Sequence, residues 1–546
     1  MDKVILIGGQ AGQGSAVTSH FIGKVFCSLG YYVFNYRDYP SLIRGGHNFN
    51  IVRVSDKPIY SHKKNCDIIL ALDQKTIDLH QKELGKEGFI VGDKSLKGKR
   101  IRAFDGKAIL ERIKGPEILI NDVLIGYLFK YFGIDREFLL EAAEKTFKSK
   151  DGIIKKAIEE GYNLAETEEK LKKLGPKKYF ISGNEAIAVG ALASGIDVYL
   201  AYPMTPATAV LHFLAKKQID HNILTLQLEN EIAVINAALG ASFAGAKAMV
   251  GTSGGGFALM TEALSLAGMA ELPIVVYLSQ RTAPSTGVPT YTGQTDLKFA
   301  LNSGHGEFPK IVVAPGDPKE AIARTQEAFY LAAKYRTLVT ILGDKHLGES
   351  DYSHERLDKA LVSNQRFILA SPSQNYRSYQ LTESGVSKRA VPGQGPFVKA
   401  TSYEHDDFGY TVEDPEWIVK MNDKRLRKIT SFAKEIKKLN PIFLTGKGKN
   451  LIISWGSTKG AIVDALSELK NFKFLQISYL LPFPKEEVIR EIKKSKKVIL
   501  IENSATGLLG DVIAEQTGFI VKNKILKYDA RPFTPEDLAL KLKKFI

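Results

Sequence analysis

The sequence has 546 residues, of which 44% are hydrophobic and 25% are charged, and its formal net charge is +15. This composition is typical of globular proteins, and the length predicts three or four domains. No apolar run approaches the roughly 20 residues that a membrane-spanning helix needs. The apolar run that follows Met1-Asp2-Lys3 is too short for a signal peptide, so we expect a cytoplasmic protein with no membrane partner.

The sequence contains two cysteines, Cys27 and Cys66. This number excludes a disulfide scaffold and any four-thiolate zinc or iron–sulfur site built by this chain alone. We expect both thiols to be buried and inert. The basic charge favours solvated lysines or an acidic partner, and no nucleic acid is expected, because none of the usual nucleic-acid-binding signatures occurs.

The first part of the chain predicts an open α/β sheet. An apolar run at residues 4–7 leads into the sequence GGQAGQGS, and a helical pattern follows at residues 16–27. Further short apolar runs at residues 50–54, 68–72 and 89–91 alternate with helical stretches, as expected of this fold class. A lysine-rich polar segment near residue 175 is typical of a linker, so we place the first domain at residues 1–174.

A second α/β domain is expected at residues 175–349. Its predicted strands lie at residues 197–202, 223–228, 248–252 and 274–278. Residues 350–438 show weak periodicity and many Ser, Gln, Tyr and Pro residues, which predicts a long excursion that is functional or wraps another part. A last α/β domain at residues 439–546 has predicted strands at residues 451–454, 474–477 and 498–501.

The glycines of the first turn suggest an anion site. Gly9, Gly12 and Gly14 lie between a predicted strand and helix, where free backbone amides bind phosphate groups. A dinucleotide site would also need an acid about 20 residues later, a role for which Asp38 is the candidate. Arg44 adds a cation beside a second glycine pair. The alternative for the glycine loop is a tight turn that binds no ligand. The alternative for the glycine pair beside Arg44 is an ordinary surface turn.

Polar residues follow several predicted strands of the second domain. Thr205 lies between two prolines that stiffen its loop and project its hydroxyl, Glu229 and Glu231 follow the next strand, and Arg281 follows the strand at residues 274–278. Each has a simpler explanation, such as a rigid turn, a favourable helix dipole or an exposed arginine. Ligands of open α/β sheets bind outside the carboxyl ends of strands, so the coincidence favours one site. The helix after Glu231 is rich in small residues, which predicts close packing under a ligand or a partner.

These motifs together resemble one enzyme family. AYPMTPAT, LENEIAVINAALGASFAGAKAMVGTSGGGFALMTEAL, SQRTAPSTGVPT and GHGEFPKIVVAPGDP resemble segments of the alpha subunit of 2-oxoacid:ferredoxin oxidoreductases. GGQAGQG and IRGGHNFNIVRVSDKPI are similar to its gamma domain, fused here at the N-terminus, and WGSTKG and LIEN to its C-terminal domain. The resemblance covers nearly the whole chain. It implies a gamma-type α/β domain, a thiamine-pyrimidine-binding-like open parallel-sheet domain and a transketolase C-terminal-like α/β domain.

The resemblance also implies a reaction and residue roles. The reaction is the thiamine-diphosphate-dependent oxidative decarboxylation of pyruvate, 2-oxoglutarate or a broad range of 2-oxoacids to acyl-CoA and carbon dioxide, with ferredoxin as the electron acceptor. In such enzymes the glutamate that contacts the aminopyrimidine lies nine residues before a helix glycine. Glu231 lies nine residues before Gly240 and Glu229 eleven, which favours Glu231. The remaining implied contacts are Thr205 and Arg281 with the substrate, Tyr202, Pro203, Ser253 and Gly254 with the cofactor, and the GGQAGQGS loop with an anion or coenzyme A.

The sequence lacks the Gly-Asp-Gly motif with which these enzymes bind the magnesium of thiamine diphosphate. The resemblance therefore implies a separate beta subunit that carries the magnesium ion and an iron–sulfur cluster, and we expect this chain to be active only with that partner and to hold no metal itself. The alternatives are a self-sufficient transketolase-like enzyme, which the missing motif disfavours, and a non-catalytic subunit that binds a nucleotide or coenzyme A.

Overall fold

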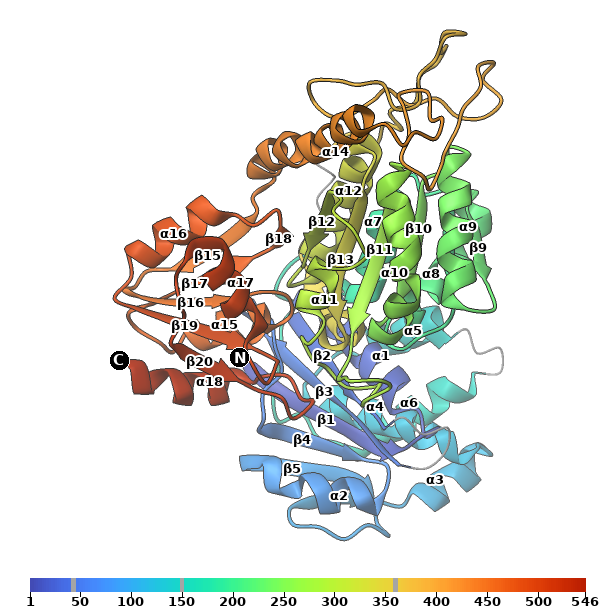
Figure 1. Ribbon diagram of the computed structural model, residues 1–546. Coiled ribbons are helices and arrows are strands. Elements are labelled where there is room, and N and C mark those ends of the chain that lie inside the picture. The colour runs from blue at the N-terminus through green and yellow to red at the C-terminus, as the bar shows by residue number, and fades with distance from the viewer. Residues whose placement is uncertain (41–45, 148–151, 357–361) are drawn as a thin grey trace.

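The computed structural model describes residues 1–40, 46–147, 152–356 and 362–546. Its strands form three sheets, and helices pack around each of them (Figure 1). The units built on the first, second and third sheets are called here the first, second and third units. The first unit lies at the bottom of the view, the second above it and the third to the left. This architecture confirms the three expected α/β units.

The first sheet has eight strands and mixes parallel with antiparallel pairs. The long strand β1 runs parallel to β4 and antiparallel to β3. The strands in spatial order are β6 (Ile101–Phe104), β5 (Leu84–Asp93), β4 (Cys66–Ala71), β1 (Asp2–Gln10), β3 (His47–Ser55), β2 (Tyr32–Asp38), β14 (Asp351–His354) and β7 (Tyr179–Ser182). The helices are α1 (Ser15–Ser28), α2 (Gln74–His80), α3 (Gly106–Ile113), α4 (Ile120–Tyr131), α5 (Arg136–Phe147) and α6 (Ile153–Leu164), with 3₁₀ turns η1 (Gln81–Glu83) and η2 (Glu117–Leu119).

The second sheet has seven strands, and its central strands are buried along their whole length. Every residue of β11 and β13 is buried, because helices cover both faces of this sheet, which is parallel except for the edge strand β18. The order is β18 (Tyr479–Leu481), β12 (Lys310–Val313), β13 (Leu338–Asp344), β11 (Ile274–Gln280), β10 (Ala248–Thr252), β8 (Val198–Ala201) and β9 (Leu224–Gln227). The helices are α7 (Gly183–Ala193), α8 (Thr208–His221), α9 (Glu231–Phe243), α10 (Gly254–Met269), α11 (Leu297–Leu301), α12 (Pro318–Tyr335) and α13 (Lys345–Glu349).

The third sheet has five strands, and its mainly parallel order matches the α/β expectation for the end of the chain. Its strands are β15 (Ile442–Gly446), β17 (Phe472–Ile477), β16 (Asn450–Ser454), β19 (Lys497–Glu502) and β20 (Asn523–Leu526). Its helices are α15 (Thr458–Leu466), α16 (Lys485–Lys493), α17 (Leu508–Thr517) and α18 (Pro535–Leu542), with 3₁₀ turns η3 (Lys437–Leu439) and η4 (Lys543–Phe545).

Short strands tie the three units together. In the sequence, β7 comes directly before the elements of the second unit and β14 directly after them. In space, both strands extend the first sheet beyond β2. The strand β18 follows β17 of the third sheet but pairs with β12 of the second sheet. The sheets therefore cross the domain limits expected near residues 174, 349 and 438.

The excursion at residues 350–438 contains one long helix, α14 (Pro415–Ile436), although weak periodicity does not predict one. The helix begins at the cap residue Asp414, whose side chain accepts a hydrogen bond from the Trp417 amide. In Figure 1 it lies across the top of the second unit.

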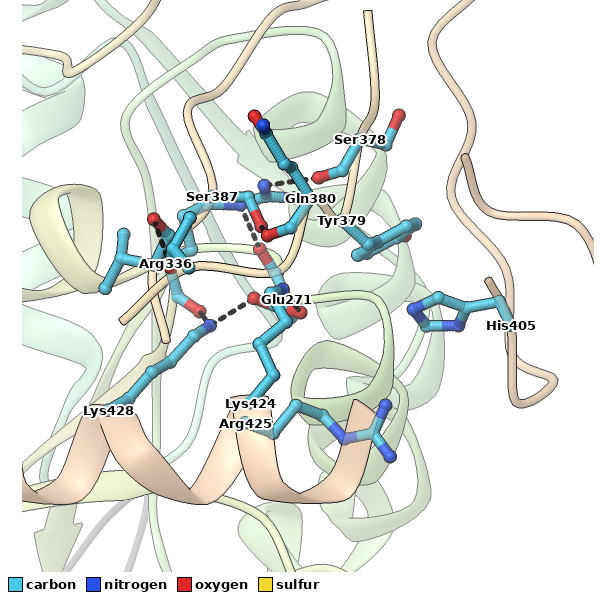
Figure 2. Close-up of polar contacts among 12 residues, drawn as sticks. Glu271, Arg336, Ser378, Tyr379, Gln380, Ser387, His405, Lys424, Arg425 and Lys428 are labelled. Carbon is cyan, nitrogen blue, oxygen red and sulfur yellow. Dashed lines mark hydrogen bonds and ion pairs between the residues drawn. The ribbon is translucent and has the colours of Figure 1, made fainter. Parts of the chain in front are cut away.

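A buried cluster of charged groups fixes this helix to the second unit, as Figure 2 shows. Glu271, in the turn before β11, forms ion pairs with Lys424 and Lys428 of α14, and all three side chains are fully buried. Arg336, in the turn before β13, donates to the Ser378 carbonyl oxygen at 2.7 Å. Burial opposes ionisation, but the two lysines hold the pKa of Glu271 well below its ordinary value. Glu271, Arg336, Lys424 and Lys428 are called here the Glu271 cluster. The cluster lies at the amino ends of β11 and β13 of the second sheet.

Candidate functional site

The carboxyl ends of four parallel strands meet at one edge of the second sheet. β8, β9, β10 and β11 run parallel, and the loops that follow them carry the residues singled out from the sequence. Arg281 Nη1 donates a hydrogen bond to the Thr205 carbonyl oxygen at 2.9 Å, which joins the loops after β8 and β11. The Thr252 hydroxyl lies 4.0 Å from Met204 Sδ. The structure therefore brings Thr205, Ser253 and Arg281 into one region.

Glu231 is the first residue of α9, and its environment differs from that of Glu229. Asn230 caps the helix by accepting a hydrogen bond from the Ala233 amide at 2.9 Å, and this turn directs Glu231 inward. Glu231 is only 4% exposed, whereas Glu229 is exposed. Its Oε1 atom is buried and has no hydrogen-bond partner. A buried carboxylate oxygen without a partner is costly, so Glu231 Oε1 is available to a group that binds here.

The first turn of α10 provides the space next to Glu231. A Cβ atom added at Gly256 would lie 2.6 Å from Glu231 Oε1 and 2.1 Å from Thr252 Oγ1. Only glycine permits so close an approach of carboxylate and helix. Ser253 occupies the cap position of α10 but its side chain caps nothing, and its buried hydroxyl has no partner.

Asp296 completes this group, and sequence reasoning missed it. Its Oδ2 atom is buried, lacks a partner and lies 2.7 Å from the Cβ position of Gly254. The residue directly precedes α11, so by pattern it is a helix cap, yet its side chain accepts no capping hydrogen bond. Burial raises the pKa of Asp296 to about 6, although the positive charge of Arg281 opposes that rise.

The remaining predicted residues lie around this group. Arg281 is half-buried, and burial lowers its pKa while Asp296 opposes the shift. Thr205 is half-buried, and its contact with Arg281 is made by its backbone carbonyl and not by its hydroxyl. Tyr202 is 38% exposed and Pro203 is half-buried, which places both at the rim.

All three units hold the loop that leads from Arg281 to Asp296. From the first unit, Asp38 Oδ1 accepts a hydrogen bond from the Tyr291 hydroxyl at 3.0 Å. From the third unit, Arg531 stacks on the Tyr291 ring at 3.6 Å and pairs with Asp38 Oδ2 at 3.2 Å. Asp38 is therefore an anchor of this loop, and both of its carboxylate oxygens have partners here.

The glycine loop of the first unit is separate from this site. β1 continues through Gly9 to Gln10, and Gly14 caps α1 with a φ of 89°, a conformation that favours glycine. Gly12 lines a cavity of about 840 Å³. The other lining residues, which come from the first unit alone, include Gln13, Ala71, Asp93, Lys107, Lys114 and Asn121. Arg44 lies outside the described residues.

The structure also bears on metals, thiols and membranes. The described residues hold no group of three or more His, Cys, Asp or Glu side chains that could bind a metal ion.

Cys27 and Cys66 are buried and form no disulfide, as expected, and burial raises the pKa of both thiols. Within the described ranges, no helix combines the length and apolar character needed to cross a membrane.

Comparison with known proteins decides the family. Residues 189–424 match the family model described as pyruvate flavodoxin/ferredoxin oxidoreductase, thiamine diphosphate-binding, and residues 4–164 match pyruvate ferredoxin/flavodoxin oxidoreductase. The 2-oxoacid:ferredoxin oxidoreductase subunit alpha of Sulfolobus sp is 32% identical over 99% of this chain and 96% of its own length. This chain belongs to the 2-oxoacid:ferredoxin oxidoreductase alpha subunits.

Further similarities agree with this family. Subunit alpha of 2-oxoacid:ferredoxin oxidoreductase 1 from Sulfurisphaera tokodaii is 32% identical over 99% of this chain and 97% of its own. The structure of 2-oxoglutarate:ferredoxin oxidoreductase from Magnetococcus marinus, with 2-oxoglutarate, coenzyme A and succinyl-CoA bound, superposes with a TM-score of 0.90. That similarity covers 100% of this chain and 99% of the other at 28% identity. The family and enzyme class expected from the motifs are confirmed.

Proposed function

We propose that this chain, with a beta subunit, oxidatively decarboxylates a 2-oxoacid to acyl-CoA and carbon dioxide and passes the electrons to ferredoxin in the cytoplasm. The observation that carries the proposal is the unpartnered, buried Oε1 of Glu231 beside the first turn of α10. The relatives named for 2-oxoacids and 2-oxoglutarate support this substrate class, within which pyruvate, 2-oxoglutarate and a broad range remain candidates.

The residues at the site fit the aminopyrimidine part of thiamine diphosphate. Glu231 would hold a proton at Oε1 against a ring nitrogen, and Ser253 and Gly254 would border the ring, with Tyr202 and Pro203 at the rim. When bound, the cofactor supplies the nucleophilic carbon that adds to the 2-oxo group and holds the electrons left when carbon dioxide departs. The match of residues 189–424 to a thiamine-diphosphate-binding model supports this assignment.

Arg281 and Thr205 would bind the substrate. A guanidinium group carries five N–H donors in a planar fork that suits a carboxylate. One Arg281 nitrogen donates to the Thr205 carbonyl, which fixes the side chain in the site and leaves other donors for the substrate. The Thr205 hydroxyl, on the loop after β8, is a further donor for the substrate.

An exposed apolar edge beside the site suits the beta subunit. Leu224 and Leu226 of β9 and Ile232 of α9 are 47%, 38% and 52% exposed. On the same helix, Ala238 packs in the core, but a Cβ atom at Gly240 would meet nothing within 4 Å, so the helix is open on the face that bears Gly240. An edge that is both apolar and unpaired favours a protein partner. That partner would bring the magnesium ion and the iron–sulfur cluster.

Coenzyme A fits the cavity beside the glycine loop of the first unit. The loop Gly9 to Gly14 precedes α1, and its free backbone amides lie beside a cavity of about 840 Å³. The charged residues that line this cavity have both signs: Lys107 and Lys114, and Asp93, Glu111 and Glu117. The coenzyme A bound in the related structure supports this choice of ligand. The same cavity is the basis of the alternative, a non-catalytic subunit that carries coenzyme A or a nucleotide.

The test compares the purified chain with the complex formed on co-expression with its beta subunit. We expect 2-oxoacid- and coenzyme-A-dependent dye reduction by the complex alone, and a panel of 2-oxoacids would identify the substrate. Activity of the isolated chain would contradict a site shared between subunits. A complex that binds coenzyme A but not thiamine diphosphate would support the non-catalytic alternative.

A further inference from the structure

Asp296 is a buried carboxyl group that the proposed chemistry does not use. It is 9% exposed, and its backbone amide donates to Gln280 Oε1 at 2.9 Å, which fixes the residue beside the end of β11. Its Oδ2 atom has no partner and lies against Gly254. A helix cap would direct this oxygen to the amides of α11, but no such bond forms.

The charged groups around Asp296 come from three elements. Arg281 follows β11 and is the group whose charge opposes the rise in the pKa of Asp296. Glu231 begins α9 and faces the same first turn of α10, near Gly256. Lys298 of α11 is turned away, because it pairs at 2.7 Å with Asp511 on the surface. Within the described part of the chain, no cation forms a direct ion pair with Asp296.

Substrate binding changes this balance. The carboxylate of a 2-oxoacid at Arg281 would neutralise the one cation among the described residues that favours the ionised form of Asp296, and it would add a second negative charge nearby. Like charges in a buried site favour uptake of a proton by one of them.

We propose that Asp296 is a positioning residue that balances the charge of Arg281 before substrate binds and takes up a proton when a 2-oxoacid carboxylate reaches Arg281. The proton comes from solvent and is released when the substrate carboxylate leaves, so no other reactant is needed. The protonated Oδ2 then becomes a hydrogen-bond donor beside the first turn of α10. This inference rests on the proposed function, because it requires Arg281 to bind the substrate.

The decisive measurement is the pH dependence of KM for pyruvate and 2-oxoglutarate in the complex with the beta subunit. Uptake of one proton makes binding weaker as pH rises, by up to about tenfold per pH unit. Because the pKa of Asp296 is about 6 in the free protein, we expect KM of the wild type to rise between pH 6 and pH 8. D296N imitates the protonated form, so its KM should equal the wild-type value at low pH and stay level.

D511N is the matched control. Asp511 lies on the surface and pairs with Lys298, which is two residues along the chain from Asp296. The KM of D511N should follow the wild-type slope. A D296N profile with the wild-type slope would overturn the proposal, as would a level wild-type profile. A merely structural role would change the melting temperature or kcat without removing the slope.

A second measurement covers the case in which D296N does not assemble. Calorimetric titration of the wild-type complex, prepared without thiamine diphosphate and in buffers of different ionisation enthalpy, counts the protons bound with 2-oxoglutarate. Proton uptake near pH 7 supports the proposal, and its absence overturns it. An inactive wild-type complex would instead contradict the proposed function, so the two failures are distinguishable.

Discussion

Two glutamates separated by one residue have different environments. Asn230 ends the extended chain and starts α9, so Glu231 turns inward against Gly256 while Glu229 stays in solvent. The spacing to Gly240 favours Glu231, and the burial agrees with that choice. Asp296 could not be selected in this way, because an acid before a short helix is typical of an ordinary cap.

We expect E231Q to lower kcat of the complex by at least about 100-fold, because the variant cannot hold or release a proton at Oε1. E229Q should keep near wild-type activity. Dye reduction by the two variant complexes, together with their thiamine diphosphate affinities, measures the difference. Loss of activity in E229Q but not in E231Q would move the role to the other glutamate.

At the scale of elements, α14 shows why periodicity can fail. Its buried face includes Lys424, Arg425 and Lys428 beside Met421 and Phe432. The spacing is helical, but half of the inward residues are cations, which apolar-pattern reasoning assigns to the surface. Carboxylates from distant segments make that face suitable for the interior, because Glu271 pairs with the two lysines and Glu404 with Arg425.

Removal of that carboxylate should therefore be costly. We expect E271Q to lower the free energy of unfolding by about 3–5 kcal/mol, because two buried lysines lose their partner. E486Q, which breaks the exposed pair between Lys437 and Glu486, should leave it near the wild-type value. Urea unfolding measures both.

The pH dependence of the E271Q effect has a defined sign. The pKa of Glu271 is lower in the folded protein than in the unfolded chain. Its contribution is present above the ordinary glutamate value of about 4.3 and is lost as pH falls below it. The difference between wild type and E271Q should therefore shrink in acid. A constant difference would show that the lost charge is not the cause.

At the scale of the whole molecule, the third unit is held to the first by a second buried ion pair. Arg53 Nη1 of β3 lies 2.7 Å from Asp464 Oδ2 of α15, and the Ser61 hydroxyl donates to the same oxygen at 2.6 Å. Both charged side chains are almost fully buried. The loop from Arg281 to Asp296 depends on the same arrangement of units, because Asp38 of the first unit binds the Tyr291 hydroxyl and Arg531 of the third stacks on its ring.

We expect D464N to lower the free energy of unfolding by about 1–3 kcal/mol, because Arg53 loses one carboxylate partner but keeps Asp2, and to let the third unit unfold before the rest. Calorimetry would then show two transitions instead of one, and KM for the 2-oxoacid would rise because the loop loses its support. E515Q removes an exposed carboxylate of α17 in the third unit and should change neither property. A single, unshifted transition in D464N would contradict this account.

The sequence alone determined the three α/β units, the strand ends that carry Thr205, Glu231 and Arg281, and the family. Each depends on local order, since an apolar run, a turn and a helix follow one another along the chain. The tertiary structure decided which groups meet: Asp296 beside Gly254, Asp38 at the Tyr291 hydroxyl, and Glu271 between two lysines. Those pairs are tens to hundreds of residues apart, and the burial that changes their electrostatics exists only once the units have packed.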